Sequence, residues 1–372
     1  MAGRKRENCR LSPGYKKNMV ILLTIRDIIT KFVNKYPIKM KHNCFSIRLR
    51  AARLMSGLSM AQLADRCRIR LTRQSISRYE QGAMTPKPPL LHALAEALAI
   101  STDYLMGHGV EIDRPMLRTG IGSGMGDEAA EMISAQVAYW AEQYLAEEQR
   151  TGIAHMFVNE IAPVVVGTQD EALKAAQLLR KSWRCGEGPL PHLLRLMERK
   201  GIKILDTPLP KDVYGLSTWA DAIHPLIIID SRPEKTTVER LRFTACHELG
   251  HLMLTIADGT EAAMTEKLCS KFASYFLFPP DTYIEEVGER RDSITLAELA
   301  DLRSVYGTSI AAMVHQAYDL GVIGREHYDW WYDEMIKENP REEGWGQYDI
   351  AETIGREKRI KSIAEKGIPR TQ

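Results

Sequence analysis

Apolar residues recur at helical spacing along most of the chain, whereas the short apolar runs typical of strands are confined to one stretch. The strand-like runs are residues 202–205, 213–219 and 225–230. Helical patterns lie on both sides of them, including residues 128–150, 168–183, 296–306 and 310–320. The pattern therefore predicts a mainly α fold with one small sheet, in which the strands share an α+β domain with the later helices.

One helix follows the last strand-like run directly. Its apolar stripe has 3.6-residue spacing and consists of Val238, Leu241, Ala245, Leu249 and Leu252. Residues 236–239, with a threonine at 236 and a glutamate at 239, have the pattern of a capping box that would begin the helix. We therefore expect this helix to bury one side and to leave the opposite side available for chemistry.

The opposite side carries the two histidines of His247-Glu248-Leu249-Gly250-His251, an H-E-x-x-H motif. Histidines four residues apart on a helix differ by only about 40° in azimuth, so both imidazoles can face one metal ion. Glu248 flanks the pair, where its carboxylate could accept a proton from water. The alternative is a buried helix with two satisfied histidines, but the capping box and the stripe favour a metal site.

A catalytic zinc usually takes three protein ligands, so the two histidines need one more. The acidic residues shortly downstream are Asp258, Glu261 and Glu266. Glu266 lies on the next predicted helix among small residues, which would let the two helices approach closely, and a carboxylate would complete a hydrolytic ligand set. Cys246 and Cys269 are rival soft ligands, although both are better explained as small buried residues.

Near the start of the chain, residues 43–107 have the pattern of five short helices. Ser59 and Thr72 would cap the second and third of them, which a tight turn joins. The third helix carries four polar residues on one face, namely Arg73, Gln74, Ser77 and Arg78. Arginine pairs with guanine and glutamine with adenine, so this face could read the major groove of double-stranded DNA. The alternative is a helical bundle with a solvated charged face.

Glycines at 120, 122, 124 and 126 indicate a flexible linker after this helical region. The sequence thus divides into 1–42, a basic N-terminal arm or mis-assigned start; 43–107, the helical DNA-binding region; 108–166, the linker and an amphipathic helix; 167–325, the metal domain; and 326–372, a C-terminal extension. Residues 1–41 hold eleven Lys/Arg against two acidic residues, which predicts salt-dependent, sequence-independent affinity for DNA.

Composition places the chain among soluble globular proteins, with 44% hydrophobic and 26% charged residues. The most apolar early run, residues 19–25, is far short of the roughly 20 residues that a membrane span needs. The six cysteines are scattered without a C-x-x-C pair, which is typical of reduced thiols. We therefore expect a cytoplasmic protein that has no membrane partner.

The helical region resembles the XRE (lambda repressor-like) helix-turn-helix family. The resemblance rests on residues 48–53, 57–59, 63–64, 75–82 and 94–98. One departure is Met60, at a position where this family usually has glutamine. The resemblance implies binding to double-stranded DNA, which we expect the protein to perform as a homodimer.

The later domain resembles the ImmA/IrrE family of zinc metallopeptidases. The resemblance covers residues 165–325 and is carried by residues 213–218, 227–230, 242–251 and 266–279. It implies a zincin-like α+β fold in which His247, His251 and Glu266 bind zinc and Glu248 is the general base. The fusion implies a transcriptional regulator that cleaves a partner repressor. The alternative is a non-proteolytic repressor or antitoxin-like regulator whose metal domain senses a ligand or partner.

Overall fold

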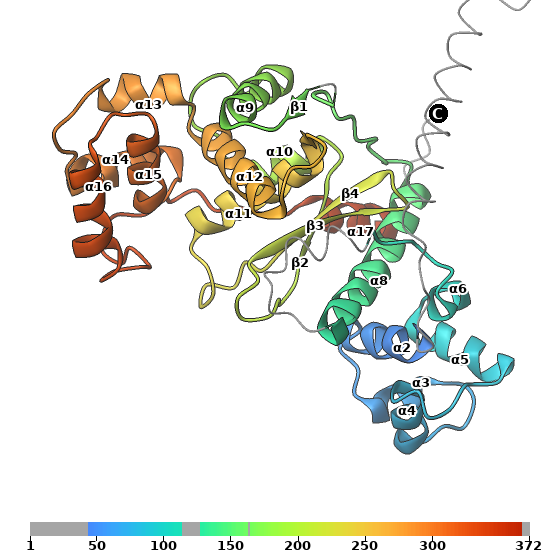
Figure 1. Cartoon of the computed structure of the whole chain (residues 1–372). Helices are drawn as coiled ribbons and strands as arrows, with labels where there is room; N and C mark the ends of the chain where they lie inside the picture. Colours follow the sequence, from blue (N-terminus) through green and yellow to red (C-terminus); the bar gives the residue numbers. More distant parts are fainter. Residues whose placement is uncertain (1–43, 114–126, 163, 367–372) are drawn as a thin grey trace, which may run out of the picture. The chain divides into compact units, whose positions relative to one another are not determined.

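The computed structural model describes residues 44–113, 127–162 and 164–366 (Figure 1). The basic arm and the glycines of the expected linker, at 120–126, lie outside the described residues. All contacts reported below lie within one compact unit of the chain, Phe45–Gln372.

The predicted five-helix region is present. Its helices are α2 (Cys44–Met55), α3 (Met60–Arg66), α4 (Arg73–Glu80), α5 (Pro88–Leu98) and α6 (Thr102–Met106). Ser59 caps α3, where its hydroxyl accepts from the Gln62 N–H, and Thr72 caps α4 in the same way from the Ser75 N–H. The two helices of the helix-turn-helix therefore begin where the sequence predicts.

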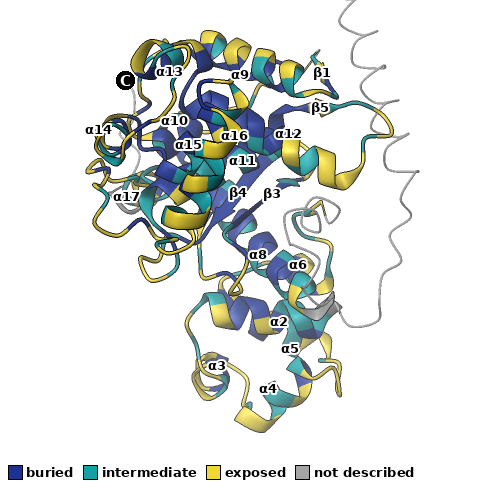
Figure 2. Ribbon diagram, turned by 60° about the vertical axis from the view of Figure 1, so that its left-hand side comes forward, coloured by how far each residue is buried: buried dark blue, intermediate teal, exposed yellow. Residues whose placement is uncertain are grey.

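The core of this region is built from side chains of all five helices. Its most buried members are Leu49, Leu63, Ile76, Leu94 and Tyr104. A buried ion pair between Arg53 and Glu80, at 2.6 Å, ties α2 to the end of α4. The outer surface of α4 remains exposed (Figure 2), so packing fixes the helix while leaving its polar face available.

Helix α8 (Asp127–Thr151) matches the predicted amphipathic helix and contributes to two cores. Near its start, the Ala135 carbonyl accepts a 2.8 Å hydrogen bond from the Tyr104 hydroxyl of the helix-turn-helix region. Val137 and Trp140 pack with Leu226 and other apolar residues of the sheet. Its apolar side is therefore explained by packing within the chain.

The sheet contains the three predicted strands, β2 (Lys203–Asp206), β3 (Gly215–Ala220) and β4 (His224–Ile229). Their order is β2-β4-β3, with β2 parallel and β3 antiparallel to the central strand β4. A separate parallel pair, β1 (Val165–Val166) with β5 (Thr255–Ile256), was not evident from the sequence. Strand β3 thus lies at the end of the three-stranded sheet.

Four helices pack around this sheet. They are α9 (Gln169–Trp183), α10 (Leu193–Arg199), α11 (Val238–Met253) and α12 (Ala262–Leu277). Helix α11 packs on β3 and β4 and against α12, which in turn packs against α9 (Figure 1). Ala245, Leu249 and Leu252 of the predicted stripe are buried in this core, so the opposite side of α11 is free to carry the motif.

The predicted capping box of α11 is wrong by one residue. Thr237, not Thr236, caps the helix, and its hydroxyl accepts from the Arg240 N–H at 3.3 Å. Glu239 is buried and instead accepts a 2.7 Å hydrogen bond from Arg303, which is 64 residues away in sequence. A long-range ion pair therefore takes the carboxylate that the local pattern assigned to the cap.

The remaining helices complete the C-terminal half. They are α13 (Pro280–Val287), α14 (Leu296–Tyr306), α15 (Ile310–Asp319), α16 (Arg325–Trp330), the π-helical turn η1 (Trp331–Ile336) and α17 (Arg356–Lys366). Trp331, Tyr348 and Ile360, all beyond residue 325, are buried in the cores of the preceding elements. The segment that follows the predicted metal domain therefore packs as part of its structure.

The fold is mainly helical with small sheets, an all-α helix-turn-helix region followed by an α+β domain, as the sequence predicts. The described cysteines at 67, 185, 246 and 269 are free thiols. None of the helices in the described ranges combines the length and apolar character that crossing a membrane requires.

Candidate metal centre

His247, His251 and Glu266 converge at the junction of α11 and α12. The His247 and His251 Nε2 atoms lie 3.2 Å apart, and Glu266 Oε2 is 3.0 Å from His247 Nε2. Glu266 Oε1 is 3.4 Å from His251 Nε2. Their ligand atoms all lie within 4.8 Å of one another, which is close enough to hold one metal ion. Among the described residues, this trio is the one set of at least three His, Cys, Asp or Glu side chains that meets this condition.

Close packing of the two helices makes this convergence possible. A Cβ atom added to Gly250 would lie 3.2 Å from Cys269 Cα on α12, so a larger side chain would push the helices apart. The His251 side chain is nearly buried, whereas the Glu266 side chain is 38% exposed. The trio is therefore anchored on the histidine side and open to solvent on the carboxylate side.

Each histidine is also held through its other ring nitrogen. Ser270 Oγ lies 3.2 Å from His247 Nδ1, and Cys269 Sγ lies 3.5 Å from His251 Nδ1. Such partners fix a ring so that its Nε2 lone pair points at a metal. Cys269, which the sequence left as a rival ligand, is thus behind the ring and not among the converging atoms.

The other rival ligands lie elsewhere. Cys246 is completely buried in the core, and this burial raises the pKa of its thiol well above the usual range. Asp258 and Glu261 are exposed, and Glu261 is the N-cap residue of α12, about one and a half turns before Glu266. The geometry thus favours Glu266 over the two other carboxylates.

Without a metal, the trio holds opposite charges together. Burial opposes the charging of His251, but its contacts with Cys269 and Glu266 outweigh that effect and raise its pKa to about 11. Burial likewise opposes ionisation of Glu266, yet hydrogen bonds from His247 and His251 lower its pKa to about 2. A metal cation would supply the positive charge that protonated histidine supplies here, so proton and metal compete for one site.

Glu248 faces β3, beside the trio. Its side chain is buried, and Oε2 accepts a 2.6 Å hydrogen bond from Ser217 Oγ. A Cβ atom on Gly215 would come 2.5 Å from Thr244 Cγ2 and 3.5 Å from Glu248 Cγ, so the strand approaches the helix closely here. Ser217 was not evident from the sequence, because only its position on the face of β3 toward α11 distinguishes it from other serines.

The DNA-reading candidates share the outer face of α4. Arg73, Gln74 and Arg78 are exposed, and Ser77 is half-buried, where its hydroxyl accepts a 3.3 Å hydrogen bond from Gln81. Ile76 and Tyr79, on the opposite face, are buried. This arrangement is what a recognition helix requires, with an inner face for packing and a polar outer face.

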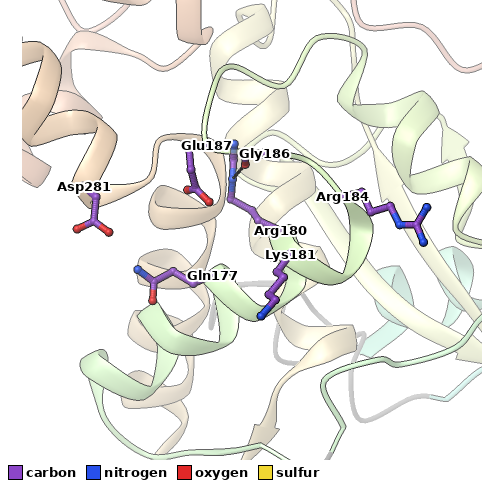
Figure 3. A pocket seen from close by; sticks show the side chains of 7 residues that line it. All are labelled: Gln177, Arg180, Lys181, Arg184, Gly186, Glu187 and Asp281. Carbon is purple, nitrogen blue, oxygen red and sulfur yellow. Dashed lines mark hydrogen bonds between the residues drawn. The ribbon is translucent and has the colours of Figure 1, made fainter.

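A surface pocket of about 540 Å³ is lined by neither the candidate metal ligands nor the DNA-reading candidates of α4 (Figure 3). It is lined by Gln177, Arg180, Lys181, Arg184, Gly186, Glu187 and Asp281. The Arg180 guanidinium donates to the carbonyls of Gly186, Gly188 and Phe276. Because backbone carbonyls occupy this buried arginine, its role is to hold the loop after α9, and it is not available to bind an anion.

Comparison with protein families agrees with this geometry. A family model described as helix-turn-helix matches residues 49–105, and one described as IrrE N-terminal-like domain, of peptidase family M78, matches residues 197–318. No curated protein matches the chain. The chain therefore joins an XRE-type DNA-binding domain to an ImmA/IrrE-like domain, as the sequence predicts. Members of the second family are typically metal-dependent, which fits the His/Glu trio as a possible metal site.

Proposed function

We propose that this protein is a DNA-binding transcriptional regulator whose ImmA/IrrE-like domain is a zinc-dependent endopeptidase that cleaves a partner repressor. The observation that carries the proposal is the convergence of His247, His251 and Glu266 beside the buried carboxylate of Glu248. A metal site alone would serve sensing or structure, whereas a carboxylate beside it is what hydrolysis requires.

The donor set fits zinc. Two imidazole nitrogens and one carboxylate oxygen form a ligand set common in zinc hydrolases, and they leave a further position open. When bound, zinc would act as a Lewis acid that polarises a peptide carbonyl and makes water acidic near neutral pH. Ser270 and Cys269 orient the two rings, and the exposed carboxylate of Glu266 leaves the site accessible.

The protein's own groups would handle the proton. Glu248 would accept a proton from the attacking water and return it to the departing amine. The hydrogen bond from Ser217 restrains one carboxylate oxygen, which leaves the other to take part in the transfer. Placement of Glu248 in a buried position also limits the carboxylate to few rotamers, so its orientation is set before substrate arrives.

Cleavage of a partner is the direct test of this function. Helix-turn-helix repressors encoded beside the gene for this protein are the first candidates, each incubated with purified full-length protein and zinc. We expect one of them to be cut at a defined bond, and a chelator to stop the reaction. If every candidate stays intact while the protein binds zinc and DNA, the endopeptidase proposal fails.

Zinc content gives the first prediction. Wild-type protein should hold about one zinc per chain, and His247→Ala and Glu266→Ala should each lose tight binding because two ligands remain. Affinity should rise with pH, since the raised pKa of His251 makes protons compete with the metal. Glu261→Ala is the matched control, because it removes an exposed glutamate from the same helix terminus. Full zinc retention in Glu266→Ala would contradict the ligand assignment.

DNA binding gives the second prediction. We propose that a homodimer reads two half-sites about one helical turn apart through Arg73, Gln74, Ser77 and Arg78. Arg73→Ala and Gln74→Ala should each lose roughly 1–3 kcal/mol on the selected site and relax its sequence preference. The control is Arg290→Ala, which removes an exposed arginine from the peptidase-like domain. Equal losses for Arg73→Ala on random DNA would show a phosphate contact instead of base reading.

A further inference from the structure

Charge is unevenly distributed between two helical parts of the chain. Residues 280–353, which span α13 to η1 and the segment that follows, contain seventeen Asp/Glu against six Lys/Arg. Residues 44–107, the helix-turn-helix region, contain nine Lys/Arg against four Asp/Glu. Opposite net charges attract each other through water at low salt, so the acidic part of one molecule and the basic part of another can approach favourably.

Helix α16 and the turn η1 present an acidic face to solvent. Its exposed residues are Glu326, Trp330, Asp333, Glu334, Lys337 and Glu338. Asp333 forms an ion pair with Lys337 within this face. The three glutamates have no ion pair with any residue that the structure describes, so the chain itself does not neutralise their charges.

Trp330 lies in the middle of this face, four residues from Glu326 and four from Glu334. Its side chain is 46% exposed. The indole ring stacks on the His327 ring, with centroids 5.6 Å apart, and meets the buried Trp331 edge to face at 5.4 Å. A partner that covers this indole would therefore not have to order it first. Arginine suits such a face, because its guanidinium can stack on an indole and pair with a neighbouring carboxylate.

The helix-turn-helix region of this chain carries an arginine-rich surface of that kind. From the end of α3 through α4, five arginines are exposed, namely Arg66, Arg68, Arg70, Arg73 and Arg78. Within the described ranges, Arg68 is the one of these five that reaches a carboxylate, that of Glu96 at 3.8 Å. The surface that would contact DNA can therefore also contact a different acidic surface.

We propose that the face of α16 and η1 around Trp330 binds the arginine-rich surface of α4 in a second copy of this chain, so that this self-association and DNA binding exclude each other. Charge complementarity selects this occupant, because the arginines that would contact DNA phosphates are those that carboxylates also attract. The contact joins two different surfaces, so each molecule carries both halves of it. It requires neither metal nor cleavage and thus goes beyond the peptidase proposal.

Mixing two charge-reversed, full-length variants tests the contact. Glu326→Arg, Glu334→Arg reverses the acidic face, and Arg73→Glu, Arg78→Glu reverses the basic one; all four positions are exposed, so the fold should survive. In sedimentation at low salt, each variant alone should show salt-dependent association at least about tenfold weaker than the wild type, because like charges would meet. An equimolar mixture should associate again, since each variant retains the face that the other lacks. A mixture that associates no better than its components overturns the proposal.

Two further variants separate a defined contact from attraction by net charge. Asp212→Arg, Asp301→Arg is the matched control, because it reverses two exposed carboxylates outside the face of α16 and η1. It should associate as the wild type does, and a loss equal to that of Glu326→Arg, Glu334→Arg would overturn the proposal. Trp330→Ala leaves the net charge unchanged and should weaken association about tenfold. Thermal unfolding of every variant shows whether its fold is kept.

A DNA duplex obtained by selection tests the exclusion. Added to the wild type, it should abolish the salt-dependent association in proportion to the protein that it binds, which anisotropy of labelled DNA measures in the same samples. Salt-dependent association that persists on DNA-bound protein would overturn the exclusion, and a wild type without such association would overturn the contact. If no duplex binds, the DNA-binding proposal fails together with the exclusion, whereas the mixing experiment still decides the contact between copies.

Discussion

Glu248→Gln should lower the rate of repressor cleavage by about 10²–10⁴ while leaving zinc content unchanged. Glutamine keeps the shape of the side chain and can still contact Ser217, but it cannot accept the proton of the attacking water. Glu248 does not belong to the converging trio, so metal binding should survive the change. The measurement is the cleavage rate of a repressor that the wild type cuts, with zinc content determined for both proteins.

Glu261→Gln is the matched control, since it makes the same chemical change at the exposed N-cap residue of α12. It should leave the cleavage rate unchanged. If wild type and Glu248→Gln relieve repression equally in cells, with no cut product, the domain acts as a metal-containing sensor and not as a peptidase. This comparison distinguishes a metal-containing sensor from a peptidase, because a sensor needs only the metal ligands, whereas a hydrolase also needs the general base.

The pairing of the two histidines on one side of α11 was predictable because the information for it is local. The spacing of His247 and His251 follows from helix geometry, and the apolar stripe shows which side of α11 they leave. The position of Glu266 close to the two histidines was harder to predict, because it is not a local property. It depends on how closely α12 approaches α11, which the small residues at Gly250 and Cys269 permit.

Contacts between distant segments were not predictable in the same way. The capping box was misassigned because Glu239 pairs with Arg303. The two residues are 64 positions apart, and no local sequence pattern predicts that they meet. Ser217 gained a role only when β3 was placed against α11. The burial of Tyr348 could not be inferred from local patterns, since its N–H donates to Glu239, 109 residues earlier, and its ring lies against the Arg242 guanidinium.

Two glutamates of the C-terminal segment, Glu342 and Glu352, share one structural role. Glu342 accepts from the N–H groups of Ile310 and Ala311 at the start of α15 and pairs with Arg303 at 3.1 Å. Glu352 accepts from the N–H groups at the start of α10 and pairs with a buried arginine of α11. The C-terminal segment thus supplies carboxylates that cap helices of the preceding domain.

The second of these contacts fixes the helix that bears the motif. Helix α10 has His192 at its N-cap, without a side-chain cap, and Glu352 accepts from the Leu193 and Leu194 N–H groups at 3.1 Å each. Arg242, the ion-pair partner of Glu352, is completely buried and lies about one and a half turns of α11 before His247. Arg242 also donates to the Leu190 carbonyl and to the adjacent carbonyls of Tyr306 and Gly307, so with Glu352 one guanidinium joins α11 to three other segments.

Glu352→Ala should therefore destabilise the protein by about 3–5 kcal/mol, because it leaves the Arg242 charge buried without a counter-ion and exposes the start of α10. Chemical denaturation of the full chain measures this loss. Glu343→Ala is the matched control, since its ion pair with Arg341 lies at the surface and should contribute no more than about 1 kcal/mol.

The double variant Arg242→Met, Glu352→Met tests the cause of that loss. If an uncompensated buried charge is responsible, removal of both charges should be less damaging than Glu352→Ala alone, because apolar side chains can fill the same space. If the double variant is as unstable as Glu352→Ala, the carboxylate acts mainly by capping α10. If Glu352→Ala loses no more than Glu343→Ala, the C-terminal segment does not anchor α11. Zinc affinity, measured alongside, should fall with stability, since Arg242 and His247 belong to one rigid helix.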